Sequence, residues 1–131
     1  MINIKMLALM MMAVLIACKA TSIKKELIFN SLTFDNQSGS VLNDVKISVD
    51  KTGAFVSCGL VYKGPSCSTS FPAKVYQGNS VQISWQIKGV AYSVGPIYVE
   101  PPILIDSNTP ANIIIKFGLE SEITTKFSYE Q

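Results

Sequence analysis

The sequence predicts an all-β fold, an antiparallel β-sandwich of seven to eight strands, and two observations carry this prediction. The first is hydrophobic alternation with a period of two, which places one face of a strand against a core and the other in water. The second is a series of Gly-, Pro-, Asn- and Asp-containing turn signals at intervals of roughly ten residues. A small barrel is the alternative all-β architecture.

The alternation is clearest in segments 45–50, 81–88 and 123–129. Ile83 and Trp85 lie in phase within one of them, so Trp85, the only tryptophan, is predicted to pack in the core. Segments 27–34 and 111–117 are more continuously apolar, which favours central strands covered on both faces. No segment after residue 18 shows a helical period over three turns, so little or no helix is expected.

The expected strands are 26–35, 42–50, 54–61, 67–72, 80–88, 91–100, 111–117 and 122–129. Three prolines, Pro96, Pro101 and Pro102, fall in segment 92–105. Because proline cannot donate to a strand ladder, this segment is predicted to be an edge strand or an extended arm. We favour prolines that protect the edge from pairing, and the alternative is an edge that accepts a strand from a partner.

The N-terminus has the pattern of a targeting signal. Lys5 precedes an uncharged apolar run of 12 residues, Met6 to Ala17. A membrane-spanning helix needs about 20 apolar residues, whereas this length fits the apolar region of a secretory signal peptide. Residues 1–17 are therefore predicted to be a signal peptide.

The run ends in Leu15-Ile16-Ala17-Cys18, which resembles the lipobox of bacterial lipoproteins. The resemblance implies that Cys18 carries acyl chains that hold the protein to a membrane, with residues 18–25 as a tether and 26–131 as the folded domain. By the same resemblance, Lys19 after the cysteine implies an outer-membrane lipoprotein facing the periplasm or the cell surface. An ordinary signal peptide cut after Ala20, or an uncleaved anchor, remains open.

Two cysteines remain after Cys18, namely Cys58 and Cys67. An even pair in an exported protein predicts a disulfide, here across a short hairpin or compact loop. A redox-active pair and a metal site are weaker alternatives, because the chain has no Cys-x-x-Cys motif and no histidine.

Segment 36–47, a polar turn leading into a hydrophobic strand, is similar to the opening of many extracellular sandwich modules. The architecture as a whole resembles an immunoglobulin-type or transthyretin-type sandwich. Immunoglobulin domains, however, have widely spaced cysteines that bridge the two sheets, whereas Cys58 and Cys67 are close in sequence.

The composition argues against an enzyme. The chain has no histidine and no arginine, so it lacks an imidazole base and a bidentate phosphate clamp. A net charge of +2 does not indicate a nucleic-acid partner. We expect no cofactor, no metal and no catalytic residue, although paired carboxylates or a Ser–Lys pair leave a small hydrolase open.

The leading interpretation is a lipid-anchored, non-enzymatic binding module of the bacterial cell envelope. Its partners would be the membrane, through acyl chains on Cys18, and an envelope protein. Tyr62 and Lys63, inside the Cys58–Cys67 loop, are the candidate contact residues. The protein could be an accessory subunit of an envelope machine. Alternatively, it could be an immunity or inhibitor lipoprotein that neutralises a periplasmic toxin or hydrolase.

Overall fold

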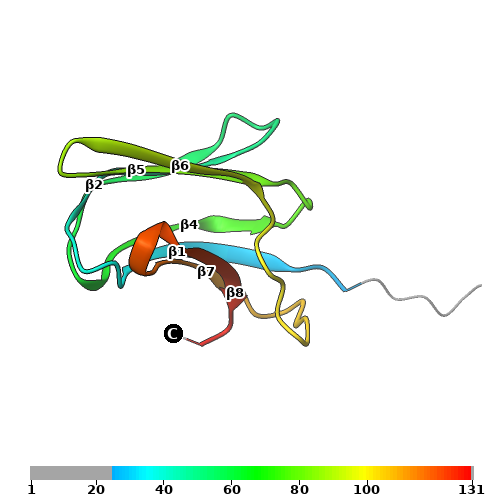
Figure 1. Ribbon diagram of the computed structural model, residues 1–131. Coiled ribbons are helices and arrows are strands. Elements are labelled where there is room, and N and C mark those ends of the chain that lie inside the picture. Colours follow the sequence, from blue (N-terminus) through cyan, green and yellow to red (C-terminus); the bar gives the residue numbers. More distant parts are fainter. Residues whose placement is uncertain (1–24, 131) are drawn as a thin grey trace, which may run out of the picture.

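A computed structural model describes residues 25–130 of the chain (Figure 1). The signal peptide predicted over 1–17 and the lipidation predicted at Cys18 fall outside these residues. The strands are β1 (Ile28–Asn36), β2 (Leu42–Val49), β3 (Phe55–Val61), β4 (Gly64–Val75), β5 (Val81–Ile87), β6 (Val90–Ile97), β7 (Ala111–Phe117) and β8 (Ile123–Ser128). The 3₁₀ turn Leu119–Ser121 is the only helical element among the described residues.

The strands form two four-stranded sheets, in the orders β4-β1-β7-β8 and β3-β2-β5-β6. The sheets lie one above the other in Figure 1, so the predicted sandwich is confirmed and the closed barrel is wrong. Eight strands were expected, and each lies at its predicted place. The largest difference is in β4, which extends over Gly64–Val75 rather than 67–72.

One pairing departs from a purely antiparallel sandwich, because β1 and β7 run parallel. The edge strand β6 is followed by residues 98–110, which cross to the other sheet. This arm passes beside the start of β1, where the Glu26 amide donates to Ser107 Oγ at 3.1 Å. Because the arm ends beside the start of β1, Ala111 at the start of β7 pairs with Phe29. Strand β7 therefore runs in the same direction as β1.

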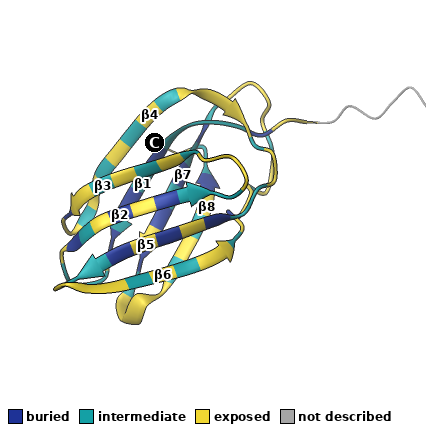
Figure 2. Cartoon of the chain, turned by 90° about the horizontal axis from the view of Figure 1, so that it is seen from above, coloured by how far each residue is buried: buried dark blue, intermediate teal, exposed yellow. Residues whose placement is uncertain are grey.

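Alternation with a period of two builds the core, as the stripes of buried residues in Figure 2 show. Trp85 is 3% exposed, and its ring meets that of Phe117 edge-on at 5.3 Å, which confirms its predicted core position. The segments predicted as central strands, now β1 and β7, do occupy the centre of their sheet. Neither strand is fully buried on both faces, however. The fully buried residues of each strand alternate with residues that are half-buried or, at Lys116, exposed.

The sandwich is complete within the part of the chain described. All buried apolar residues lie between Leu27 and Phe127, and the disulfide lies between the same limits. A chain beginning at Lys19 therefore retains every strand and every core residue that the structure describes. No helix in this part is long and apolar enough to cross a membrane.

Candidate functional site

The two predicted contact residues form the entire connection between β3 and β4. Strand β3 ends at Val61 and β4 begins at Gly64, so that only Tyr62 and Lys63 join them. Both side chains are exposed, and Tyr62 retains 57% of its surface. The reversal is completed by Gly64, whose φ of +87° is a conformation that glycine adopts at low cost.

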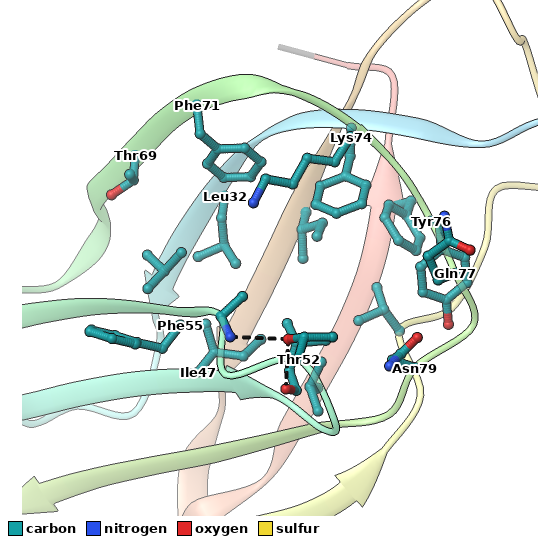
Figure 3. A pocket seen from close by; sticks show the side chains of 18 of the residues that line it. Leu32, Ile47, Thr52, Phe55, Thr69, Phe71, Lys74, Tyr76, Gln77 and Asn79 are labelled. Carbon is teal, nitrogen blue, oxygen red and sulfur yellow. Dashed lines mark hydrogen bonds between the residues drawn. The ribbon is translucent and has the colours of Figure 1, made fainter.

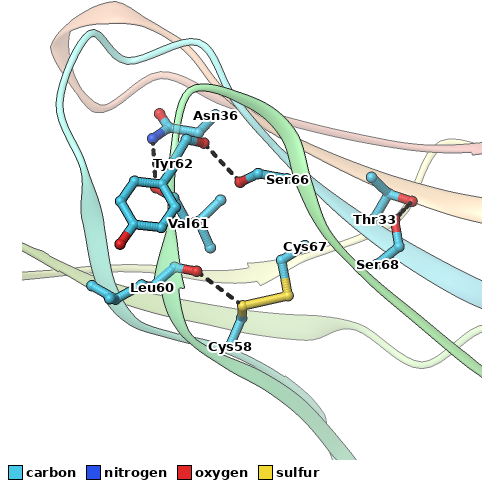
Figure 4. Close-up of a disulfide and its surroundings, with 9 residues drawn as sticks. All are labelled: Thr33, Asn36, Cys58, Leu60, Val61, Tyr62, Ser66, Cys67 and Ser68. Atoms are coloured by element: carbon cyan, nitrogen blue, oxygen red, sulfur yellow. Dashed lines mark hydrogen bonds between the residues drawn. A yellow bond between two sulfur atoms is a disulfide. The ribbon is translucent and has the colours of Figure 1, made fainter.

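The predicted disulfide joins Cys58 of β3 to Cys67 of β4, with the two Cα atoms 6.7 Å apart (Figure 4). Of the two predicted forms, the compact loop is confirmed and the hairpin is wrong, because β3 and β4 belong to different sheets. The short loop is a crossing between sheets rather than a turn within one. The bond therefore fastens the edge strands of the two sheets together, beside the Tyr62–Lys63 connection.

A buried asparagine fixes the same end of the sandwich. Asn36, only 1% exposed, donates its amide hydrogens to the carbonyl oxygens of Ser40, at 2.7 Å, and Val61, at 2.9 Å. Its Oδ1 accepts hydrogen bonds from the amide and hydroxyl of Ser38. Ser66 Oγ also donates to the Tyr62 carbonyl at 2.8 Å (Figure 4). The backbone that presents Tyr62 is thus held from both sides.

Exposed apolar side chains accompany Tyr62. Val41 and Tyr62 flank the paired residues Leu42 and Val61, and Leu60 follows the same outward phase along β3. Val41 is 44% exposed and Leu60 is 48% exposed. We call the exposed group Val41, Leu60, Tyr62 and Lys63 the turn surface.

The turn surface lies at the opposite end of the sandwich from the entry of the chain. Ile28, at the start of β1, pairs with Val75, whereas Asn36, at its end, pairs with Gly64. The nine residues of β1 separate these two ends. At about 3.3 Å per residue, the strand places them roughly 25–30 Å apart.

A second candidate site, which the sequence did not reveal, is a cavity of about 380 Å³ between the sheets (Figure 3). It opens between the edge strands β3 and β4, in the half of the sandwich nearer the chain entry. Its walls include Leu32 and Phe127 from one sheet and Ile47 from the other. Apolar residues at these positions fill a core in most sandwiches, so periodicity gives no signal for a cavity.

The cavity lining bears on the hydrolase alternative. Its polar members are Thr52, Thr69, Lys74, Tyr76, Gln77 and Asn79. They include no carboxylate and no serine, so the lining does not supply a complete pair for either hydrolase mechanism. Among the described residues, no group of three or more His, Cys, Asp or Glu side chains is placed to hold a metal ion.

Two side chains near the chain entry, Tyr76 and Asp106, have pKa values shifted from their usual ones. Burial, and to a lesser extent repulsion from Tyr98, raises the pKa of Tyr76 above 10.0. Hydrogen bonds from the Thr109 hydroxyl and the Asn108 amide, helped by the charge of Lys25, lower the pKa of the exposed Asp106 carboxyl. The carboxyl is held by its own loop, which indicates a structural role.

Comparison with protein-family models, with curated proteins and with solved structures gives no match for this chain. The geometry of the turn surface and of the cavity therefore carries the functional argument. The first is an exposed, partly apolar surface whose backbone is held by hydrogen bonds beside a disulfide, and the second is an apolar space with a polar rim. Both arrangements suit binding.

Proposed function

We propose that the chain is a non-enzymatic binding module of the bacterial cell envelope, anchored to the outer membrane through lipid on Cys18. Its turn surface engages an envelope protein as an accessory subunit of an envelope machine. The single observation that carries this proposal is the placement of the turn surface at the end of the sandwich away from the chain entry. A tether at residues 18–25 would present that surface away from the membrane.

The chemistry of the turn surface supports a protein partner. Tyrosine is enriched among the residues that dominate binding energy, and flanking apolar side chains exclude water around it. The disulfide and the Asn36 hydrogen bonds fix the backbone before binding. A surface held in this way loses little conformational entropy on association, and anchoring to a membrane raises its effective concentration beside a partner in the same membrane.

The experiment is site-specific photocrosslinking in native envelopes, with a photoreactive residue at Tyr62 of the full chain. The matched control is Tyr98, which is 69% exposed and is the first residue of the arm that follows β6. We expect one stoichiometric adduct from position 62 and none from position 98. Equal adducts from both positions, or none from 62, would contradict the proposal.

The affinity for the captured partner provides the quantitative test. If Tyr62 is a dominant contact, Tyr62→Ala weakens binding roughly thirtyfold, while Tyr98→Ala leaves it unchanged. The identity of the adduct separates the two binding functions. A subunit of an envelope machine supports the accessory role, whereas a secreted toxin or hydrolase supports the inhibitor role.

The anchor is tested separately by metabolic labelling with palmitate. We expect the wild-type chain to be labelled and Cys18→Ser to be unlabelled. Equal labelling of the two would contradict lipidation at Cys18, while leaving the turn surface to be judged by its own experiment.

A further inference from the structure

The cavity between β3 and β4 is separate from the turn surface and calls for its own explanation. Its walls combine aliphatic and aromatic residues of both sheets, and Phe71 and Phe55 stand on opposite sides of its mouth in Figure 3. The volume of about 380 Å³ falls within the range of small-molecule sites, roughly 300–1,000 Å³. The disulfide holds the two edge strands together at one end of the opening only.

The cavity lining carries a single positive charge. Lys74 is the one charged residue that lines the cavity, and no acidic residue does. Its Nζ lies 5.8 Å from the centre of the Phe71 ring, beside the opening (Figure 3). The Asp50 carboxylate, which does not line the cavity, accepts hydrogen bonds from the Ser80 hydroxyl and the Gln82 amide. Lys46 is not part of the lining, although its Nζ lies 4.5 Å from the centre of the Phe55 ring at the other side of the mouth. The site thus combines an apolar interior with one charged side chain in its lining, Lys74.

We infer that this cavity binds a free fatty acid, with the acyl chain between the sheets and the carboxylate at Lys74. Burial of methylene groups drives binding, at about 0.8 kcal/mol for each, and the ammonium group selects an anionic end. The inference goes beyond the proposed function and needs neither the turn surface nor acylation of Cys18. Acyl chains attached to Cys18 would carry no free carboxylate and would gain nothing from Lys74.

The test uses a chain beginning at Lys19, which retains the whole sandwich, with thermal unfolding to confirm that each variant is folded. The probes are dodecanoate, 1-dodecanol and dodecyltrimethylammonium, below their aggregation concentrations, in competition with a fluorescent fatty acid. Lys74→Gln removes the cation, and Ala54→Trp fills the mouth of the cavity. Lys88→Gln, an exposed lysine in the β5–β6 turn, is the matched control.

We expect dodecanoate to bind more tightly than the alcohol, and the cationic amphiphile to bind most weakly. Lys74→Gln should weaken dodecanoate roughly two- to fivefold, as an ion pair at a partly exposed rim does, and leave dodecanol unchanged. Ala54→Trp should weaken both at least tenfold, and Lys88→Gln neither.

Three results would overturn the inference. These are no saturable binding of dodecanoate, binding that is unaffected by Ala54→Trp, and equal affinity for acid and alcohol with no effect of Lys74→Gln. A fourth result would also overturn it: the native lipidated chain fails to bind the fluorescent fatty acid, and Cys18→Ser restores binding. That result would assign the cavity to the chain's own acyl group. None of these results bears on the adduct expected at Tyr62, so the two proposals fail separately.

Discussion

The side-chain amide of Asn36 donates to the carbonyl oxygen of Val61 at 2.9 Å, across the gap between the two sheets. Asn36 ends β1 in one sheet and Val61 ends β3 in the other. Because Val61 is fully buried, its carbonyl has little access to water and depends on this partner. One buried polar side chain thus fixes the strand that leads into Tyr62.

Asn36→Ala should destabilise the fold by about 2–4 kcal/mol, since it leaves several buried or half-buried backbone groups without partners at about 1–3 kcal/mol each. The measurement is urea unfolding followed by Trp85 fluorescence. The control is Asn108→Ala, at an exposed loop position, which should change stability by less than about 0.5 kcal/mol. Equal effects of the two substitutions would show that the buried amide does not hold the sheets together.

Loss of the disulfide should lower stability by about 2.5–3 kcal/mol, because the bond closes a short loop whose freedom in the unfolded chain it removes. The paired substitution Cys58→Ser with Cys67→Ser tests this by urea unfolding. A reducing agent should destabilise the wild-type chain by a similar amount and leave the double variant unchanged. A loss below about 1 kcal/mol would mean that the connection is held mainly by Asn36 and Ser66.

The strands could be predicted because their signal is local. Whether Trp85 faces the core depends only on its phase relative to Ile83 and its other neighbours in the same strand, and that phase is visible in the sequence. Turn residues mark where each strand ends, which is why the expected boundaries lie close to those of the structure.

The assignment of strands to sheets could not be predicted, because it depends on contacts between distant segments. Cys58 and Cys67 are close in sequence, which favours a hairpin, but β3 pairs with β2 and β4 pairs with β1. The burial of Asn36, at the start of a run of turn residues, follows from the same crossing. The cavity also arises from it, since β3 and β4 stand at unpaired edges of different sheets.

Gly95 in β6 lies against the neighbouring strand at a distance that excludes a side chain. A Cβ atom there would stand 2.9 Å from both Gln82 Cα and the Val81 carbonyl oxygen, and the φ of +141° is one that other residues rarely adopt. Gly95→Ala should therefore destabilise the fold by about 2–4 kcal/mol through backbone strain and overpacking.

The matched control is Gly59→Ala, because a Cβ at Gly59 would meet no atom within 4 Å. It should leave the free energy of unfolding within about 0.5 kcal/mol of wild type, or raise it slightly by restricting the unfolded chain. Both variants are compared by urea unfolding. If Gly95→Ala were as stable as Gly59→Ala, β6 would have to shift away from β5 at little cost.

The raised pKa of Tyr76 predicts a loss of stability in alkaline solution. In the unfolded chain this hydroxyl ionises near 10.0, whereas in the folded chain burial and the Tyr98 charge hold its proton to higher pH. Between these two pKa values the unfolded state binds fewer protons, so the free energy of unfolding falls as pH rises, and this contribution levels off above the folded pKa. Tyr76→Phe should remove this part of the alkaline loss, measured as melting temperature against pH. The control Tyr62→Phe, on the exposed turn, should follow the wild-type curve, and a Tyr76→Phe curve that also follows it would contradict the assignment.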